Sequence, residues 1–245
     1  MRCQAVAFGL SVLLSLLAAP AIAGDPIFPG ATCYGRPRWT YRPLLGDVAR
    51  TVNVRSVTIS LVSALYGIGI DEGWIDLNRT LADLGIHDNE PRLTVSERDA
   101  TIRDLLMSRS GIYHGAISQG SRRVAGRPPR GSHAPGEVWF YNGWGFNALG
   151  TIYTRLMRES IFEAFDNRIA RAIGMQDFQP ERDGHFFYDS VSMHPAFVMI
   201  LSARDLARFG LLYMNDGMWT GKQVIRSGWV KESTRRWSDA ENGLG

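Results

Sequence analysis

Residues 56–70 constrain the fold of this chain more than any other segment, because apolar side chains occupy nearly every face of a helix drawn through them. The apolar positions are Val57, Ile59, Leu61, Val62, Leu65, Tyr66, Ile68 and Ile70, and small residues fill the gaps between them. A helix that is apolar on all sides is a buried one. Asp71-Glu72-Gly73 then supplies a glycine stop. We therefore predict a central buried helix from Ser56 to about Glu72.

The first 23 residues have the pattern of a secretory signal peptide. Arg2 provides a positive start, Val6–Leu17 is apolar, and Ala21-Ile22-Ala23 offers a cleavage site before Gly24. The alternative is a membrane anchor, but Pro20 ends an apolar stretch shorter than the roughly 20 residues that a spanning helix needs. We expect an exported protein, periplasmic or extracellular, with no stable membrane insertion after signal cleavage.

Composition excludes several other classes of function. Removal of the signal peptide leaves Cys33 as the single cysteine, and no metal-ligand spacing surrounds it, so we expect no disulfide, metal or cofactor. The net charge is +3, with arginines scattered among acids, and the basic stretch 121–130 is rich in glycine and proline and typical of a loop. No basic face or nucleic-acid motif is present, so we expect no nucleic-acid partner. The oligomeric state stays open.

The rest of the chain has mainly helical patterns, and convincing strands are scarce. Residues 24–45 form an irregular N-terminal segment with four prolines and three glycines. We expect helices at Thr80–Leu84, at Ile102–Met107 with Thr101 as N-cap, at 144–157, at 160–172, after a Ser202/Asp205 cap, and at Gly228–Thr234. His114 is interpreted as a structural loop residue and His194, before Pro195, as a turn residue. After signal cleavage about 220 residues remain, which fits one domain or one domain with a lobe.

Five segments occur in the order found in a known family of hydrolases. They are Arg55–Ile68 followed by the run Asp71–Leu77, Thr101–Leu106 with Ser110-Gly111-Ile112, Pro135-Gly136 leading into Phe140–Gly150, Met193-His194-Pro195, and Ser202–Gly210. Over roughly residues 46–240 the chain resembles the β-lactamase-related serine hydrolases, which include class C β-lactamases, penicillin-binding D-alanyl-D-alanine carboxypeptidases and esterases. The resemblance implies an α+β fold with helices on an antiparallel sheet plus a helical lobe. Residues 46–245 are expected to hold mostly the helical part, as a partial domain with an incomplete sheet.

The resemblance also implies an acyl-serine mechanism, with a small acyl substrate (a β-lactam or an ester) or a cell-wall peptide as partner. Ser56 occupies the nucleophile position and Tyr141 the tyrosine position, and we expect Ile59 to face the same cleft as Tyr141. In the family a lysine three residues after the serine lies one helical turn away and helps to remove its proton. Here that position holds Ile59, and Gly143 stands where the family has an asparagine. Isoleucine cannot accept a proton, and loss of a positioned base typically lowers the rate by about 10²–10⁴-fold.

Two further family features have no counterpart before Gly245: a Lys/His-Thr-Gly strand, and the strands that precede the nucleophile helix. We therefore expect a large exposed apolar patch on the helix of residues 56–70. Three hypotheses stay open: a weak serine hydrolase, a non-catalytic homologue that binds such ligands or a cell-wall partner, and a truncated, non-functional gene product.

Overall fold

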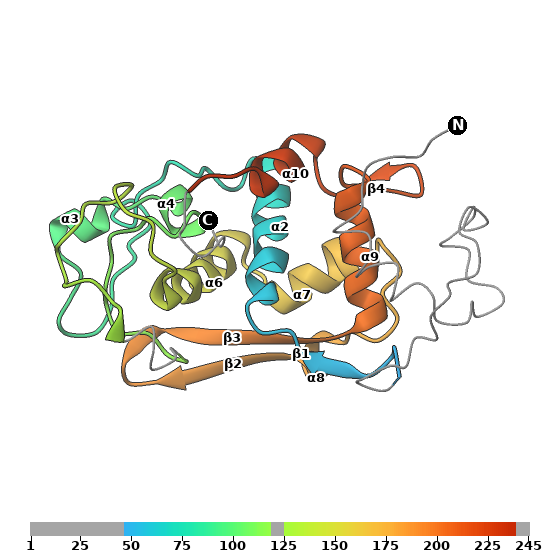
Figure 1. Ribbon diagram of the computed structural model, residues 1–245, viewed down its shortest axis with the longest axis horizontal. Helices are drawn as coiled ribbons and strands as arrows, with labels where there is room; N and C mark the ends of the chain where they lie inside the picture. Colours follow the sequence, from blue (N-terminus) through green and yellow to red (C-terminus); the bar gives the residue numbers. More distant parts are fainter. Residues whose placement is uncertain (1–46, 119–124, 239–245) are drawn as a thin grey trace.

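The computed structural model describes residues 47–118 and 125–238 (Figure 1). The predicted signal peptide and the irregular segment 24–45 lie outside the described residues. The elements are β1 (Thr51–Asn53), α2 (Val57–Asp71), α3 (Val95–Arg98), α4 (Ile102–Leu106), α6 (Gly143–Met157), α7 (Ile161–Phe165), the π-helix η2 (Asp166–Ala170), α8 (Pro180–Asp183), β2 (Gly184–Asp189), β3 (Ser192–Ser202), α9 (Ala203–Met214), β4 (Met218–Trp219), β5 (Lys222–Gln223) and α10 (Ser227–Thr234).

The predicted central helix is confirmed as α2, which begins after Ser56 and whose Leu61, Leu65 and Tyr66 are fully buried. The expected large exposed apolar patch on this helix is wrong. Of its large apolar side chains only Val57, with 44% of its surface accessible, is exposed. The reason is that α6, α7 and α10 all pack against α2. On the α10 side the Trp229 indole N–H donates to the Ser63 carbonyl at 2.9 Å.

A three-stranded antiparallel sheet lies beneath the helices, with strand order β1-β3-β2. Figure 1 shows α2, α6, α7 and α9 on one side of this sheet. Phe186 of β2 pairs with Phe197 of β3, and the Phe197 ring lies against α6 at Gly150, where an added Cβ would lie 2.6 Å from the ring. The architecture is therefore α+β, as the resemblance predicted.

The β2–β3 hairpin is the main element that the sequence analysis missed. Its two-residue turn, Ser190-Val191, is not one of the Asn-Gly, Asp-Gly or Gly-containing pairs that are the strongest sequence signal for a hairpin. The interpretation of His194 as a turn residue is wrong, because it lies in β3 and is buried.

Local capping motifs were predicted more accurately. Thr101 caps α4 in a reciprocal capping box with Asp104, and the Ser202 side chain accepts from the backbone of Asp205 at the start of α9. The helix expected at Thr80–Leu84 is wrong, since those residues form turns and Thr80 bridges to Thr101. The Leu81 N–H donates to the Ala100 carbonyl, so this segment pairs with residues 100–101 and does not form a helix. Within the described residues no helix has both the length and the apolar character needed to cross a bilayer.

Candidate active site

Ser56 is the N-cap residue of α2 and is exposed, and its hydroxyl is not used to cap the helix. The residues on either side of it are anchored to one buried residue of β3. The Val54 N–H donates to the Met199 carbonyl at 3.1 Å, and the Met199 N–H donates to the Thr58 hydroxyl at 3.3 Å. Arg55, which directly precedes Ser56, has a left-handed backbone with φ 50°, a conformation that costs a non-glycine residue about 1–2 kcal/mol. Ser56 therefore lies on a locally strained corner between β1 and α2, with hydrogen bonds to Met199 from Val54 before it and Thr58 after it.

Ile59 lies in the first turn of α2, where its N–H donates to the Ser56 carbonyl at 3.1 Å. Its side chain is half-buried and packs against the hydrophobic core. It therefore places hydrocarbon, and no proton acceptor, one helical turn from Ser56.

The two lysines of the chain lie elsewhere. Lys222 is in β5 and Lys231 in α10, and both are exposed. Helix α10 meets α2 through Trp229 at Ser63, seven residues beyond Ser56 and so about 10 Å further along the helix at 1.5 Å per residue. Neither lysine shares a helix with the serine.

The tyrosine segment leads into α6. The Tyr141 ring is half-buried and makes an edge contact with Phe146, with ring centroids 4.7 Å apart. Asn142 is the N-cap of α6: its Oδ1 accepts from the Trp144 N–H at 2.9 Å, and its Nδ2 donates to the Ile112 carbonyl. With its side chain used in this way, Asn142 does not replace the asparagine that the family has at position 143. Gly143 itself offers only backbone groups.

The helices that carry Ser56 and Tyr141 pack together. The Tyr66 hydroxyl of α2 donates to the Leu149 carbonyl of α6 at 2.7 Å, inside the core. The approach of the Ser56 and Tyr141 side chains to each other, and of Ile59 to the same cleft, stays a prediction.

Asp88 is the centre of a buried polar cluster that sequence reasoning did not find. Its side chain is fully buried, and it accepts hydrogen bonds from Trp144 Nε1 at 2.5 Å, Ser192 Oγ at 2.6 Å, the Met193 N–H at 2.6 Å and the Asn89 N–H at 2.7 Å. Burial by itself raises the pKa of this carboxyl, but the hydrogen bonds outweigh it and hold the pKa of Asp88 below its usual value. The cluster therefore contains a buried carboxylate, directly beside the helix that follows Tyr141.

Two buried histidines adjoin Asp88. His114 contacts the Pro91 carbonyl through Nε2 at 3.1 Å and approaches Asp88 Oδ2 through Nδ1 at 3.6 Å, so it has the structural role expected for it. His194 is 1% exposed, and its ring makes an edge contact with Trp144, with ring centroids 5.2 Å apart. Burial lowers the pKa of His194, an effect that the nearby Asp88 only partly offsets.

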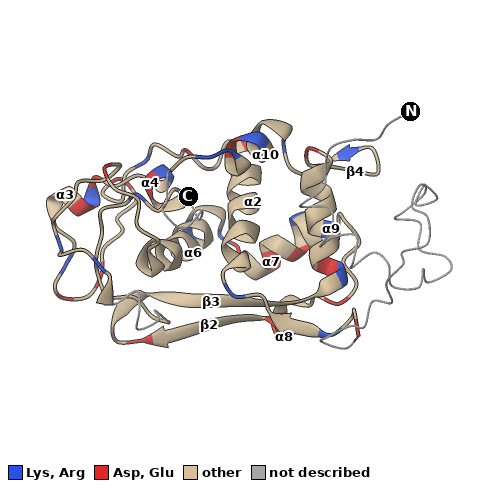
Figure 2. Cartoon of the chain, in the orientation of Figure 1, with Lys and Arg blue, Asp and Glu red and all other residues tan. Residues whose placement is uncertain are grey.

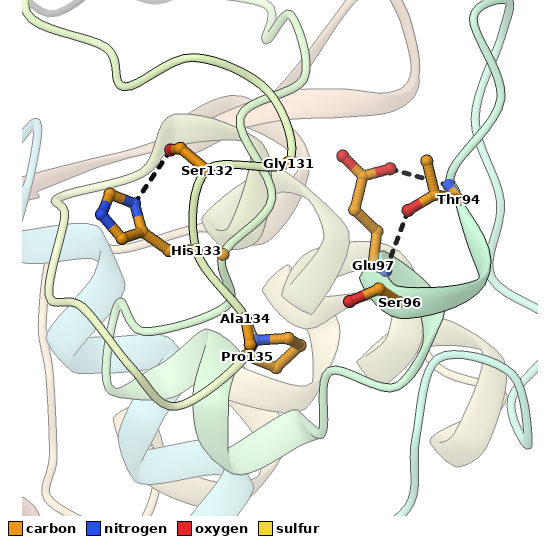
Figure 3. A pocket seen from close by; sticks show the side chains of 9 residues that line it. Thr94, Ser96, Glu97, Gly131, Ser132, His133, Ala134 and Pro135 are labelled. Atoms are coloured by element: carbon orange, nitrogen blue, oxygen red, sulfur yellow. Dashed lines mark hydrogen bonds between the residues drawn. The ribbon is translucent and has the colours of Figure 1, made fainter.

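A cavity of about 210 Å³ lies between α3 and the loop of residues 131–135 (Figure 3). The Glu97 carboxylate on its wall is already bound: Arg130 donates to both oxygens at 2.8 and 2.7 Å, and the Thr94 N–H donates at 2.8 Å. Figure 3 shows His133 turned toward Ser132, with its Nδ1 3.0 Å from the hydroxyl. Neither Ser56 nor Tyr141 lines this cavity, and the Glu97 carboxylate on its wall is already bonded, so we do not assign the acyl site to it.

Charged residues of both signs are interspersed over the elements rather than gathered on one of them (Figure 2). Within the described residues no group of three or more His, Cys, Asp or Glu side chains is arranged to hold a metal ion. The assignment of the site to Ser56 and Tyr141 stays a prediction of the motif order.

Comparison with known proteins assigns the chain to a family. The Beta-lactamase family model matches residues 51–245. The chain belongs to the β-lactamase family, the group that the sequence resemblance indicated.

Solved structures share the fold at low sequence identity. A putative 6-aminohexanoate-dimer hydrolase from Bacillus anthracis is 18% identical with a TM-score of 0.56, over 76% of this chain and 53% of that one. A putative β-lactamase from Bacteroides dorei is 15% identical with a TM-score of 0.55, over 76% and 57%. An octameric penicillin-binding protein homologue from Pyrococcus abyssi is 16% identical with a TM-score of 0.52, over 76% and 49%. The chain spans about half the length of these structures. No curated protein sequence matches it.

Proposed function

We propose that this protein is an exported serine hydrolase of the β-lactamase family whose chemistry is strongly impaired. Ser56 would attack the acyl carbon of a β-lactam, a peptidoglycan peptide or an ester. The observation that carries the proposal is Ile59: the position one turn from an exposed serine holds a half-buried aliphatic side chain in contact with the core. A neutral serine hydroxyl without a base is a poor nucleophile.

The altered tyrosine motif supports the same conclusion. Gly143 removes a side-chain amide from the segment after Tyr141, and Asn142 is held in its capping role by the Trp144 N–H and the Ile112 carbonyl. Loss of the base alone lowers the rate by about 10²–10⁴-fold, and where the nucleophile and the base act as one unit, loss of one member can cost about as much as loss of all of them.

A non-catalytic homologue that binds such a ligand or a cell-wall partner is the second candidate. It is favoured by the retained framework, because Ser56 is exposed and its flanking residues Val54 and Thr58 are both bonded to Met199. Such a protein would bind an acyl ligand with no turnover.

Export rests on the pattern of residues 1–23, which lie outside the described residues. Expression with the native N-terminus followed by N-terminal sequencing of the exported protein tests it. We expect the sequence to start at or near Gly24, and retention of Met1 would contradict export by a cleaved signal.

The catalytic proposal is tested with a chromogenic β-lactam and a p-nitrophenyl ester. The chains compared are the wild type, Ser56→Ala, Ile59→Lys, Ile59→Lys/Gly143→Asn, and the control Ser60→Ala, which alters another exposed serine of α2. We expect near-background turnover by the wild type and no rescue by Ile59→Lys alone, because Gly143 remains. Turnover by the double variant that disappears when Ser56→Ala is added assigns the chemistry to Ser56. Robust wild-type turnover that is lost in Ser56→Ala but kept in Ser60→Ala refutes the proposed impairment.

A further inference from the structure

The Asp88 cluster joins parts of the chain that are remote in sequence. Through Ser192 and Met193, Asp88 holds the start of β3, 104 and 105 residues away. Through the Trp144 indole it holds α6, 56 residues away. The same carboxylate therefore fixes the β2–β3 hairpin to the helix that follows Tyr141.

His194 is the second connection between the same parts. Its Nδ1 lies 3.1 Å from the Thr151 hydroxyl of α6, and its Nε2 lies 3.0 Å from the His87 carbonyl. A carbonyl can only accept, so Nε2 carries the proton, and the hydroxyl is free to donate to Nδ1. The site fits a neutral imidazole.

Protonation of Nδ1 breaks this fit. The Thr151 hydroxyl would have to turn from donor to acceptor, and a positive charge would enter a position that is 1% exposed. The charged and titratable groups that face the ring are Asp88 and His87 from the loop before α3 and Arg155 from α6. His114, from the loop after α4, faces Asp88 at 3.6 Å and Trp144 on its other side.

We propose that Asp88, Trp144, Thr151, Ser192, Met193 and His194, here called the Asp88 latch, form an acid-sensitive connection that holds the β2–β3 hairpin against α6. Acid opens the latch by protonating His194. Opening releases the Trp144 side chain from Asp88. Because the Trp144 backbone N–H donates to the side chain of Asn142, which directly follows Tyr141, opening also loosens the segment that presents Tyr141. The latch is independent of whether Ser56 is reactive.

The direction of the pH dependence follows from burial. Burial lowers the pKa of His194 in the closed form, while in an opened hairpin the ring has the ordinary pKa of about 6.5. The open form therefore binds more protons, and the contribution of His194 to closure is present above about pH 6.5 and is lost as the pH falls toward the lowered value. If the closed ring stays neutral, the opening constant rises about tenfold between pH 7.5 and pH 5.5.

Hydrogen exchange of the Met193 and His194 amides, corrected for intrinsic exchange rates, measures this opening. We expect a rise of up to about tenfold in the wild type from pH 7.5 to pH 5.5, with little change at the Val230 amide of α10. His194→Gln keeps a donor for the His87 carbonyl but cannot titrate, so its opening should not depend on pH in this range. His185→Gln, which alters an exposed histidine of the same hairpin, should behave as the wild type does.

Opening that is independent of pH in the wild type overturns the proposal, as does pH dependence that survives in His194→Gln. A pH dependence that disappears in His114→Gln but not in His194→Gln also overturns it. If His194→Gln does not fold, nitrogen-15 spectra of the wild-type ring decide. We expect the His194 ring to protonate below the ordinary pKa of about 6.5 and to carry its proton on Nε2 when neutral, and a charged His194 ring at pH 6.5 would contradict the latch.

Discussion

Replacement of Gly67 by alanine tests the packing that covers the central helix. A Cβ at position 67 would lie 2.1 Å from Cδ1 and 2.3 Å from Cγ of the Trp229 indole. The ring cannot simply swing away without breaking its 2.9 Å hydrogen bond to the Ser63 carbonyl. Overpacking of this kind costs about 1–3 kcal/mol, and the lost hydrogen bond adds about 1 kcal/mol. Alanine returns up to about 1 kcal/mol of helix propensity, so we expect net destabilisation of about 1–3 kcal/mol.

The same exchange at Gly228 is the matched control. Gly228 lies in α10 with open space around its Cα and no left-handed backbone, so only helix propensity acts and Gly228→Ala should stabilise by up to about 1 kcal/mol. Urea unfolding followed by circular dichroism measures both. In a Trp229→Ala background the cost of Gly67→Ala should largely vanish, because the clashing ring is gone. A Gly67→Ala chain as stable as the wild type would refute the contact between α10 and α2.

Three further changes follow from the same structure. Asp88→Asn replaces a carboxylate that accepts four hydrogen bonds, and we expect a loss of about 3 kcal/mol in urea unfolding; a change below about 1 kcal/mol would contradict the role of the charge. Arg130→Gln leaves the buried Glu97 without its bidentate hydrogen-bond partner and should lower the free energy of unfolding by about 3 kcal/mol at pH 7. Burial raises the pKa of Glu97, but the Arg130 hydrogen bond and the Thr94 contacts outweigh it and lower the pKa overall. The pair of Glu97 and Arg130 therefore contributes stability above about pH 4.5, and this contribution is lost as the pH falls further. Below that pH the melting temperature of the wild type should drop more steeply than that of Arg130→Gln. Arg55→Gly removes the cost of a left-handed backbone at φ 50° and should stabilise by about 1 kcal/mol, whereas Arg55→Ala should not.

The sequence predicts best where structure depends on neighbouring residues. Helix α2 could be predicted because its apolar residues leave no polar face, and the caps at Thr101 and Ser202 because each bonds to a backbone group three residues away. The β2–β3 hairpin was missed because its turn has no Asn-Gly, Asp-Gly or other glycine-containing pair and the β3 run Ala196–Leu201 does not alternate with polar residues.

The Asp88 latch could not be predicted from sequence for a different reason. Its partners lie 56, 104 and 105 residues away, and no local pattern distinguishes Asp88 from a solvated loop acid. For the same reason the predicted exposed patch on α2 was wrong: Trp229, which covers part of this helix, is 166 residues away from Ser63 in the sequence. Motif order predicts Ser56 and Tyr141 as site residues and Ile59 and Gly143 as the altered positions, but how their side chains lie relative to one another depends on packing.

Intact-mass measurement of the purified protein incubated with a β-lactam tests most directly whether Ile59 deprives Ser56 of its reactivity. Acylation adds the mass of one β-lactam and does not require turnover, so it detects even a site that is slow to release its product. We expect the unmodified mass after incubation at millimolar ligand for an hour, and the same for Ser56→Ala. A stoichiometric adduct that forms within minutes and maps to Ser56 would contradict the account, because it would mean that another group takes the proton that Ile59 cannot.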